Sequence, residues 1–205
     1  MAGTMPHAIF IETDLDEDGL VAAYAAELPG CAVFAPSADE AASAMPLRVA
    51  RFTAWLREAG EEVPGFVGDN WYEVERSAAT VLDGGRRRAA FTLDELPPSS
   101  AEFAAWLRWL ELAREELASA LDAGDIAPAR SLIDAIERQD VAFVRDLGGQ
   151  APQLTADSID RAYVARDALT EALESAGPLH DGVRRILRLA IADDLRATEA
   201  LQRPS

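Results

Sequence analysis

The chain has few of the residues that build covalent or metal-bound sites. Its 205 residues include one cysteine, Cys31, and two histidines, His7 and His180. A single cysteine excludes an internal disulfide and a cysteine-based metal site, and its apolar neighbours indicate a small buried side chain. His7 is expected at the start of a strand and His180 in a loop. With no histidine placed to activate a nucleophile, we expect no catalytic residue.

Lysine is absent, and acidic residues outnumber basic ones by 36 to 19, which gives a net charge of −17. Nucleic-acid binding depends mainly on neutralising phosphates with lysine and arginine. This balance therefore predicts no nucleic-acid partner, and it also disfavours anionic membrane surfaces. A run of three arginines, residues 86–88, follows Gly84-Gly85 and is predicted to be a solvated turn.

Long hydrophobic runs are also missing. No window approaches the roughly 18 apolar residues of a membrane span, and the N-terminus lacks a basic segment followed by an apolar stretch. We therefore expect a cytoplasmic protein with no membrane contact. Hydrophobic residues make up 49% of the chain, which is enough for a folded core. The length suits one large domain or two small ones.

Short segments of alternating hydrophobicity predict a small sheet in the first eighty residues. Turn-forming residues separate the segments: an acidic stretch that ends at Gly19, and Leu28-Pro29-Gly30. Strands this close together most simply form an antiparallel meander. The expected strands are residues 7–13, 20–26 and 31–35, with residues 71–78 as a candidate fourth.

One helix is expected between the third and fourth strands. Ser37 followed three residues later by Glu40 is the pattern of a capping box at a helix start. Apolar residues recur at helical spacing from Met45 to Leu56, and Gly60 marks the expected end.

In their order, these segments resemble the HicB family. The chain reads IFIETDLDEDGLVAAYAAELPGC, then SADEA, then AGEEVPG. Members of the family show a strand, an acidic turn, a second strand ending in LPGC, a T/S-x-x-E-A segment and a helix closing with GEE-x-P. The resemblance covers about residues 7–66 and implies a sheet with one packed helix, similar to part of the RNase H fold. In HicB antitoxins such a domain blocks a small RNA-cleaving toxin, which implies a protein partner; their DNA-binding C-terminal segment has no counterpart here.

Four amphipathic helices are predicted after a mixed connector. The connector, residues 81–98, carries Gly84-Gly85 and Pro97-Pro98. Ser99 and Glu102 form a second capping-box pattern at the start of the first helix. Helices of this length with short connections predict a four-helix bundle. They are expected from residue 99, from about 127 to 147, from about 157 and from about 181.

The helical half resembles the DinB-like family, including members fused behind a HicB-like domain. The segments that carry the resemblance are WLRWLELAREELASAL, RSLIDAIERQDVAFVRDLGG, IDRAYVARDALTEAL and VRRILRLAIADDLRATEAL, within residues 99–203. In that family three histidines can hold a divalent metal. They would fall at Ala135, Asp193 and Ala197, which supply one carboxylate in place of three imidazoles. The resemblance thus implies a bundle without its metal, without a cofactor, and without the metal-dependent transferase chemistry of some relatives.

Three charged residues stand where helical spacing requires apolar ones. Asp140, Arg166 and Asp194 each lie on the apolar stripe of their own predicted helix. A lone buried carboxylate is costly, whereas one paired with arginine is tolerated. We therefore predict that the three cluster inside the bundle. Such a cluster is either a structural ion pair that fixes helix register or part of a polar ligand pocket, and the sequence leaves both open.

The predicted fold class is α+β. Residues 1–80 form a HicB-like domain with a small antiparallel sheet and one packed helix, residues 81–98 a connector, and residues 99–205 an all-α DinB-like four-helix bundle. Three functions follow. The first is a non-enzymatic binding or regulatory protein, with a first domain that contacts a protein partner and a bundle that dimerises or holds a small ligand. The second is a thiol-dependent transferase. The third is a HicB-type antitoxin with an atypical C-terminal half.

Overall fold

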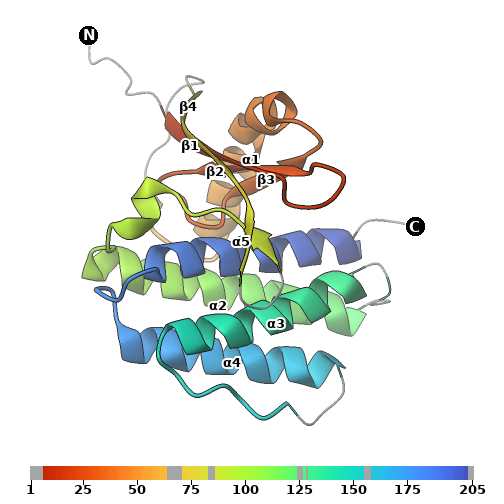
Figure 1. The fold of residues 1–205 in the computed structure, drawn as a ribbon, viewed down its shortest axis with the longest axis vertical. Helices are drawn as coiled ribbons and strands as arrows, with labels where there is room; N and C mark the ends of the chain where they lie inside the picture. The colour runs from red at the N-terminus through yellow and green to blue at the C-terminus, as the bar shows by residue number, and fades with distance from the viewer. Residues whose placement is uncertain are drawn as a thin grey trace. The chain divides into compact units, whose positions relative to one another are not determined.

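The computed structural model describes residues 7–63, 71–82, 86–123, 127, 129–154 and 158–202. Within these residues the architecture is mixed α+β, with a four-stranded sheet, a short two-stranded ribbon and five α-helices (Figure 1). None of the described helices is both long enough and apolar enough to cross a bilayer.

The chain divides into two compact units. The first unit comprises Met1–Thr80 and Arg87–Leu93, and the second comprises Val81–Arg86 and Asp94–Ser205. The residues predicted as a connector therefore belong to the two units in alternation. This stretch holds the ribbon strands β5 (Thr80–Val81) and β6 (Arg87–Arg88) and the short 3₁₀ helix η1 (Thr92–Glu95).

The first unit contains a sheet with the strand order β3-β2-β1-β4. β1 (His7–Thr13) pairs antiparallel with β2 (Val21–Ala25), and β2 pairs antiparallel with β3 (Ala32–Ala35), so the predicted meander is confirmed. β4 (Trp71–Ala78) pairs with β1 in parallel, and the expectation of an antiparallel sheet is wrong for this strand. The reason is the helix between β3 and β4: it returns the chain to the starting edge, so β4 runs in the direction of β1.

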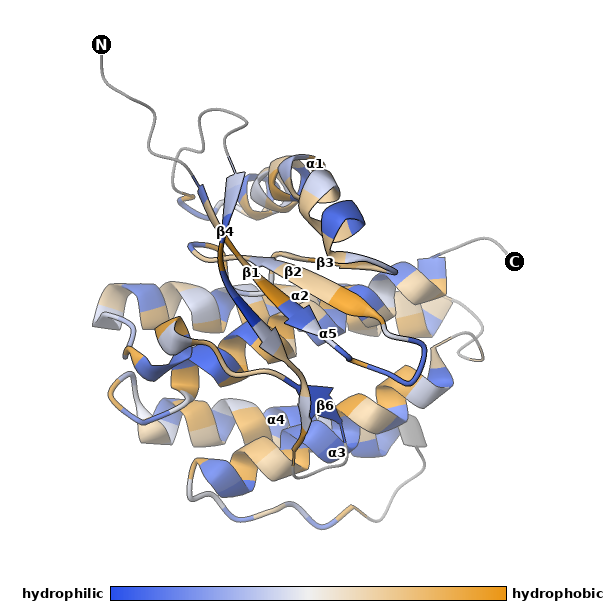
Figure 2. Ribbon diagram, turned by 45° about the horizontal axis from the view of Figure 1, so that its top comes forward, coloured by the Kyte–Doolittle hydropathy of each residue, from blue (hydrophilic) through white to orange (hydrophobic). Residues whose placement is uncertain are grey.

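The connecting helix α1 (Ala38–Glu58) covers β2 and β3. Ser37 Oγ accepts the backbone N–H of Glu40 at 3.3 Å, as the capping pattern predicts. Gly60 follows the helix with a φ of +83°, a left-handed conformation that favours glycine. In Figure 2 β1 and β2 carry mostly apolar residues, whereas much of β4 is hydrophilic. The core of this unit therefore lies around β1, β2 and the buried face of α1.

A buried carboxylate ties residues 87–93 into the first unit. Glu12 of β1 is fully buried and accepts a hydrogen bond from the Tyr24 hydroxyl at 2.7 Å and another from the backbone N–H of Ala89. Phe91 packs on Phe10 with the ring centroids 5.0 Å apart. Because its oxygens are hydrogen-bonded, Glu12 can be tolerated in this core.

The second unit is built from four helices: α2 (Ser100–Ala123), α3 (Arg130–Asp146), α4 (Ser158–Ala176) and α5 (Val183–Gln202). Each begins within a few residues of its predicted start. α2 lies beside α5, and α3 lies beside α4 (Figure 1). Gly148 and Gly149 follow α3 and donate backbone hydrogen bonds to its last turn, so they end the helix as the sequence predicts.

The capping box at the start of α2 is complete. Ser99 Oγ accepts the N–H of Glu102 at 3.2 Å, and Glu102 Oε2 accepts the N–H of Ser99 at 2.8 Å. We expect Ser99→Ala to lower the free energy of unfolding by about 1 kcal/mol, because one helix N–H loses its acceptor. Chemical denaturation measures the change. Ser119→Ala, at an exposed position near the C-terminal end of α2, is the matched control, and equal losses in the two variants would contradict the capping role.

Candidate ligand-binding cavity

The structure brings Asp140, Arg166 and Asp194 together, as predicted. Arg166 Nη2 forms an ion pair with Asp194 Oδ1, and Arg166 Nη1 lies 3.7 Å from Asp140 Oδ2. Their side chains are 2%, 5% and 0% exposed for Asp140, Arg166 and Asp194. Arg166 of α4 therefore pairs with one acid from α3, Asp140, and with one from α5, Asp194.

Helical spacing explains why these side chains face the interior. Residues three or four apart lie on one face of a helix. Each charged residue has a buried apolar residue at that distance in its own helix: Ile136 before Asp140, Leu169 after Arg166 and Ala197 after Asp194. Burying the apolar stripe thus buries the charge with it.

A second arginine joins this cluster from α2. Arg114 Nη1 donates to the hydroxyl of Thr170, and its Nε lies 3.9 Å from Asp194 Oδ2. Nε and Nη2 are buried and donate no hydrogen bond to any of the described residues. The sequence signal for Arg114 was present, because it lies four residues after Leu110 and three before Leu117 on one apolar stripe. Our sequence interpretation did not include it.

Two further buried ion pairs involve α5. Arg86 forms an ion pair with Asp193 that includes an Nη2–Oδ1 contact of 3.0 Å. Arg188 binds Asp94 through two contacts, Nε–Oδ1 at 3.1 Å and Nη2–Oδ2 at 2.6 Å. The prediction that residues 86–88 form a solvated turn is wrong for Arg86, which is largely buried, and for Arg88, which is buried. The prediction relied only on the charge of the arginine run. Burial of Arg86 is tolerated because a carboxylate far along the chain, that of Asp193, pairs with it.

Burial changes the acid–base properties of the cluster. It raises the pKa of Asp194 to about 7, although Arg166 and Arg114 oppose the shift. Burial also raises the pKa of Asp140 above its ordinary value. Burial lowers the pKa of Arg114, and the neighbouring charge of Arg166 lowers it further, despite Asp194 and Asp140.

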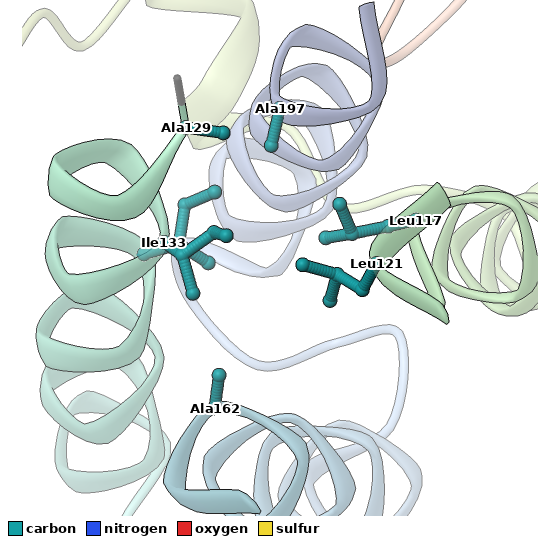
Figure 3. Close-up of a cluster of buried hydrophobic side chains, with 7 residues drawn as sticks. Leu117, Leu121, Ala129, Ile133, Ala162 and Ala197 are labelled. Atoms are coloured by element: carbon teal, nitrogen blue, oxygen red, sulfur yellow. The ribbon is translucent and has the colours of Figure 1, made fainter. Parts of the chain in front are cut away.

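A cavity of about 180 Å³ adjoins the two arginines between α2, α3 and α4. Its apolar wall is formed by Leu117, Ala118 and Leu121 of α2, Ile133 and Ile136 of α3, and Ala162 of α4. Figure 3 shows Leu117, Leu121, Ile133 and Ala162 converging on the space between the helices. Glu115 and Asp167 also line the cavity and are exposed, so they mark its mouth. The cavity is therefore largely apolar, with Arg114 and Arg166 on its wall.

The positions implied for a metal do not fit one. Ala135 and Ala197 have no donor atom, and Asp193 is engaged by Arg86. Ala197 instead belongs to the buried apolar cluster around the cavity (Figure 3). Across the described ranges, no group of three or more His, Cys, Asp or Glu side chains is arranged to hold a metal ion. His7 begins β1 and His180 lies in the exposed turn before α5, so neither replaces a missing ligand.

Comparisons of the chain with protein-family models, with curated proteins and with solved structures find no match. The functional argument therefore rests on the residues and the geometry described above.

Proposed function

We propose that the chain is a non-enzymatic binding protein whose helical unit holds a small, largely apolar molecule. The cavity between α2, α3 and α4 carries this proposal. Cavities of about 150 Å³ lined by aliphatic and aromatic side chains stay dry and bind benzene, so a volume of about 180 Å³ suits a molecule of similar size. Among the lining residues that the structure describes there is no histidine, cysteine or serine, so a serine or cysteine nucleophile with a histidine base is not found among them.

In this proposal the chain is a HicB-like unit joined to a DinB-like bundle that has lost its metal ligands. The order of three antiparallel strands, a helix and a fourth strand supports the first part. The four helices, with Ala197 in the apolar cluster, support the second. In this proposal an alanine stands where the DinB-like family has a metal-binding histidine. The alanine offers an apolar surface in place of a metal ligand, as expected of a bundle that keeps its cavity but binds a different ligand.

Filling the chamber tests the proposal. A neutral probe of matching size, benzyl alcohol, should bind the wild-type chain and raise its free energy of unfolding by about 1.4 kcal/mol at ten times its Kd. Ala162→Leu places a larger side chain in the cavity and should abolish this stabilisation. Ala168→Leu on the same helix, half-buried and outside the lining, should retain it. No stabilisation of the wild type, or equal stabilisation of the Ala162 variant, would contradict the function.

The first unit supports a second role, contact with a protein partner. β4 is an edge strand of the described sheet and carries two exposed apolar side chains, Tyr72 and Val74. Edge strands present free backbone groups to which another chain can add. A small basic protein encoded beside this gene should co-purify with the wild-type chain and not with a Tyr72→Glu/Val74→Asp variant. Val81→Asp, at another exposed valine, is the control; a gene neighbourhood without such a reading frame contradicts this role.

A further inference from the structure

The two arginines on the cavity wall present little charge to the cavity. Nε and Nη2 of Arg114 and both Nη atoms of Arg166 are buried. Nη1 of Arg114 donates to the Thr170 hydroxyl. The two side chains therefore line the cavity mainly with their aliphatic stems, as long charged side chains often do.

The charges of the interior cluster also balance one another. Arg166 pairs with both Asp140 and Asp194, and Arg114 lies on the other side of the Asp194 carboxylate. When all four residues are ionised, two positive charges stand against two negative ones. The cluster therefore offers an entering molecule no net charge.

The mouth of the cavity, in contrast, is acidic. Glu115 of α2 and Asp167 of α4 line the cavity and are exposed. Asp167 acts electrostatically on Arg114, which directly precedes Glu115, so acids of two facing helices lie on this side of the cavity. Neither carboxylate forms a hydrogen bond or an ion pair with another described residue. A cation at the mouth would therefore meet two carboxylates that have no partner in the described part of the chain.

An aromatic ring stands beside these acids. Tyr163 lies four residues before Asp167, one turn along α4, and lines the cavity in a half-buried position. Burial raises the pKa of Tyr163 and the charge of Asp122 raises it further; Arg166 opposes the shift and Asp160 adds to it. Because the face of an aromatic ring attracts cations, the ring and the acids favour the same kind of ligand.

We propose that the ligand of this cavity is a small amine with an apolar body. Its ammonium group lies at the mouth between Glu115 and Asp167, beside Tyr163, and its body fills the apolar interior. Small-ligand sites commonly combine an apolar lining with a few polar groups that fix orientation. This identification of the ligand rests on the proposed binding function. The volume of about 180 Å³ limits the body to about one benzene ring, so benzylamine is a suitable probe.

The experiment compares benzylamine, benzyl alcohol and benzoate, which share a ring and differ in charge, by calorimetric titration of the full chain. It is done at pH 8, because burial raises the pKa of Asp194 to about 7 and this acid is then mostly ionised. Benzylamine should bind at least about threefold more tightly than benzyl alcohol, and benzoate at least about threefold more weakly, since exposed charges contribute modestly. The preference should shrink between about 0.01 M and about 1 M salt, because the Debye length falls from about 30 Å to about 3 Å.

Removing the two acids at the mouth tests where the preference arises. Glu115→Gln/Asp167→Asn should bring the affinities for benzylamine and benzyl alcohol to within about twofold of each other. Both positions are exposed, so the variant should fold. Glu111→Gln/Glu174→Gln is the matched control: it removes two charges from the same two helices, at exposed positions outside the cavity lining, and should keep the wild-type order.

The outcomes separate this inference from the function on which it rests. If benzyl alcohol binds and benzylamine binds no more tightly, the amine inference is overturned and the binding function stands. Tighter binding of benzoate overturns it as well. An equal loss of preference in the control variant would mean that the overall charge of the chain attracts the amine, which overturns the site at the mouth. If none of the three probes binds, the proposed function itself fails.

Discussion

Replacing Arg166 with methionine should lower the free energy of unfolding by about 3 kcal/mol at pH 8. The substitution keeps most of the side-chain volume but leaves Asp140 and Asp194 facing each other without their shared cation. A buried charge that loses its partner is not rehydrated, so the loss is far larger than for a surface pair. Urea unfolding with a common slope measures the change.

The matched control is a pair in which both side chains are exposed. Arg76 Nη2 lies 2.7 Å from Glu73 Oε2, and the two side chains are 50% and 37% exposed. Arg76→Met should therefore cost less than about 1 kcal/mol. The loss in Arg166→Met should also shrink at pH 5, because Asp194, whose pKa burial raises to about 7, is then protonated and needs no cation. Similar losses in the two methionine variants would show that the interior cluster contributes no more than a surface pair.

The second large effect is a pH-dependent difference between wild type and Asp194→Asn. Burial raises the pKa of Asp194 to about 7 in the folded chain, whereas an unfolded aspartate has a pKa of about 3.9. Between these values the folded state holds a proton that the unfolded state has lost. The stabilisation from this proton is complete below about pH 4, is lost as the pH rises towards 7, and is absent above that.

The free energy of unfolding of wild type relative to Asp194→Asn should accordingly fall by about 1.4 kcal/mol per pH unit between pH 5 and 7. It should level off near pH 8. Asp122→Asn, at an exposed position of α2, should show no comparable slope. A difference that rises with pH in this window would mean that Arg166 and Arg114 outweigh burial and hold the pKa of Asp194 low.

Local patterns were enough to predict most elements of the fold. Alternation gave β1 and β4 at their observed bounds, and the serine–glutamate boxes gave the starts of α1 and α2, because both signals arise within a few neighbouring residues. The direction of β4 was not predictable in the same way. It depends on how α1 crosses the sheet, and that is set by packing between segments far apart in sequence.

Part of the charged cluster could also be predicted from local patterns. Asp140, Arg166 and Asp194 interrupt apolar stripes, which can be recognised within one helix. Arg86 gave no such signal, because its partner Asp193 is 107 residues away and a run of arginines is usually solvated. A polar pocket beside the cluster was one of the two interpretations that the sequence left open, but the size of the cavity and its apolar lining could not be predicted. They depend on the volume that the side chains of three helices leave unfilled.

The alternating membership of residues 81–94 bears on how this protein could have been assembled from parts. A cut after Thr80 would remove Ala89 and Phe91, so Glu12 would lose a backbone donor and Phe10 its aromatic neighbour. A cut after Leu93 would instead take Arg86 away from Asp193. No single breakpoint in the chain therefore separates two intact units. A fragment that keeps either unit complete must carry residues 81–93, whichever half it is cut from.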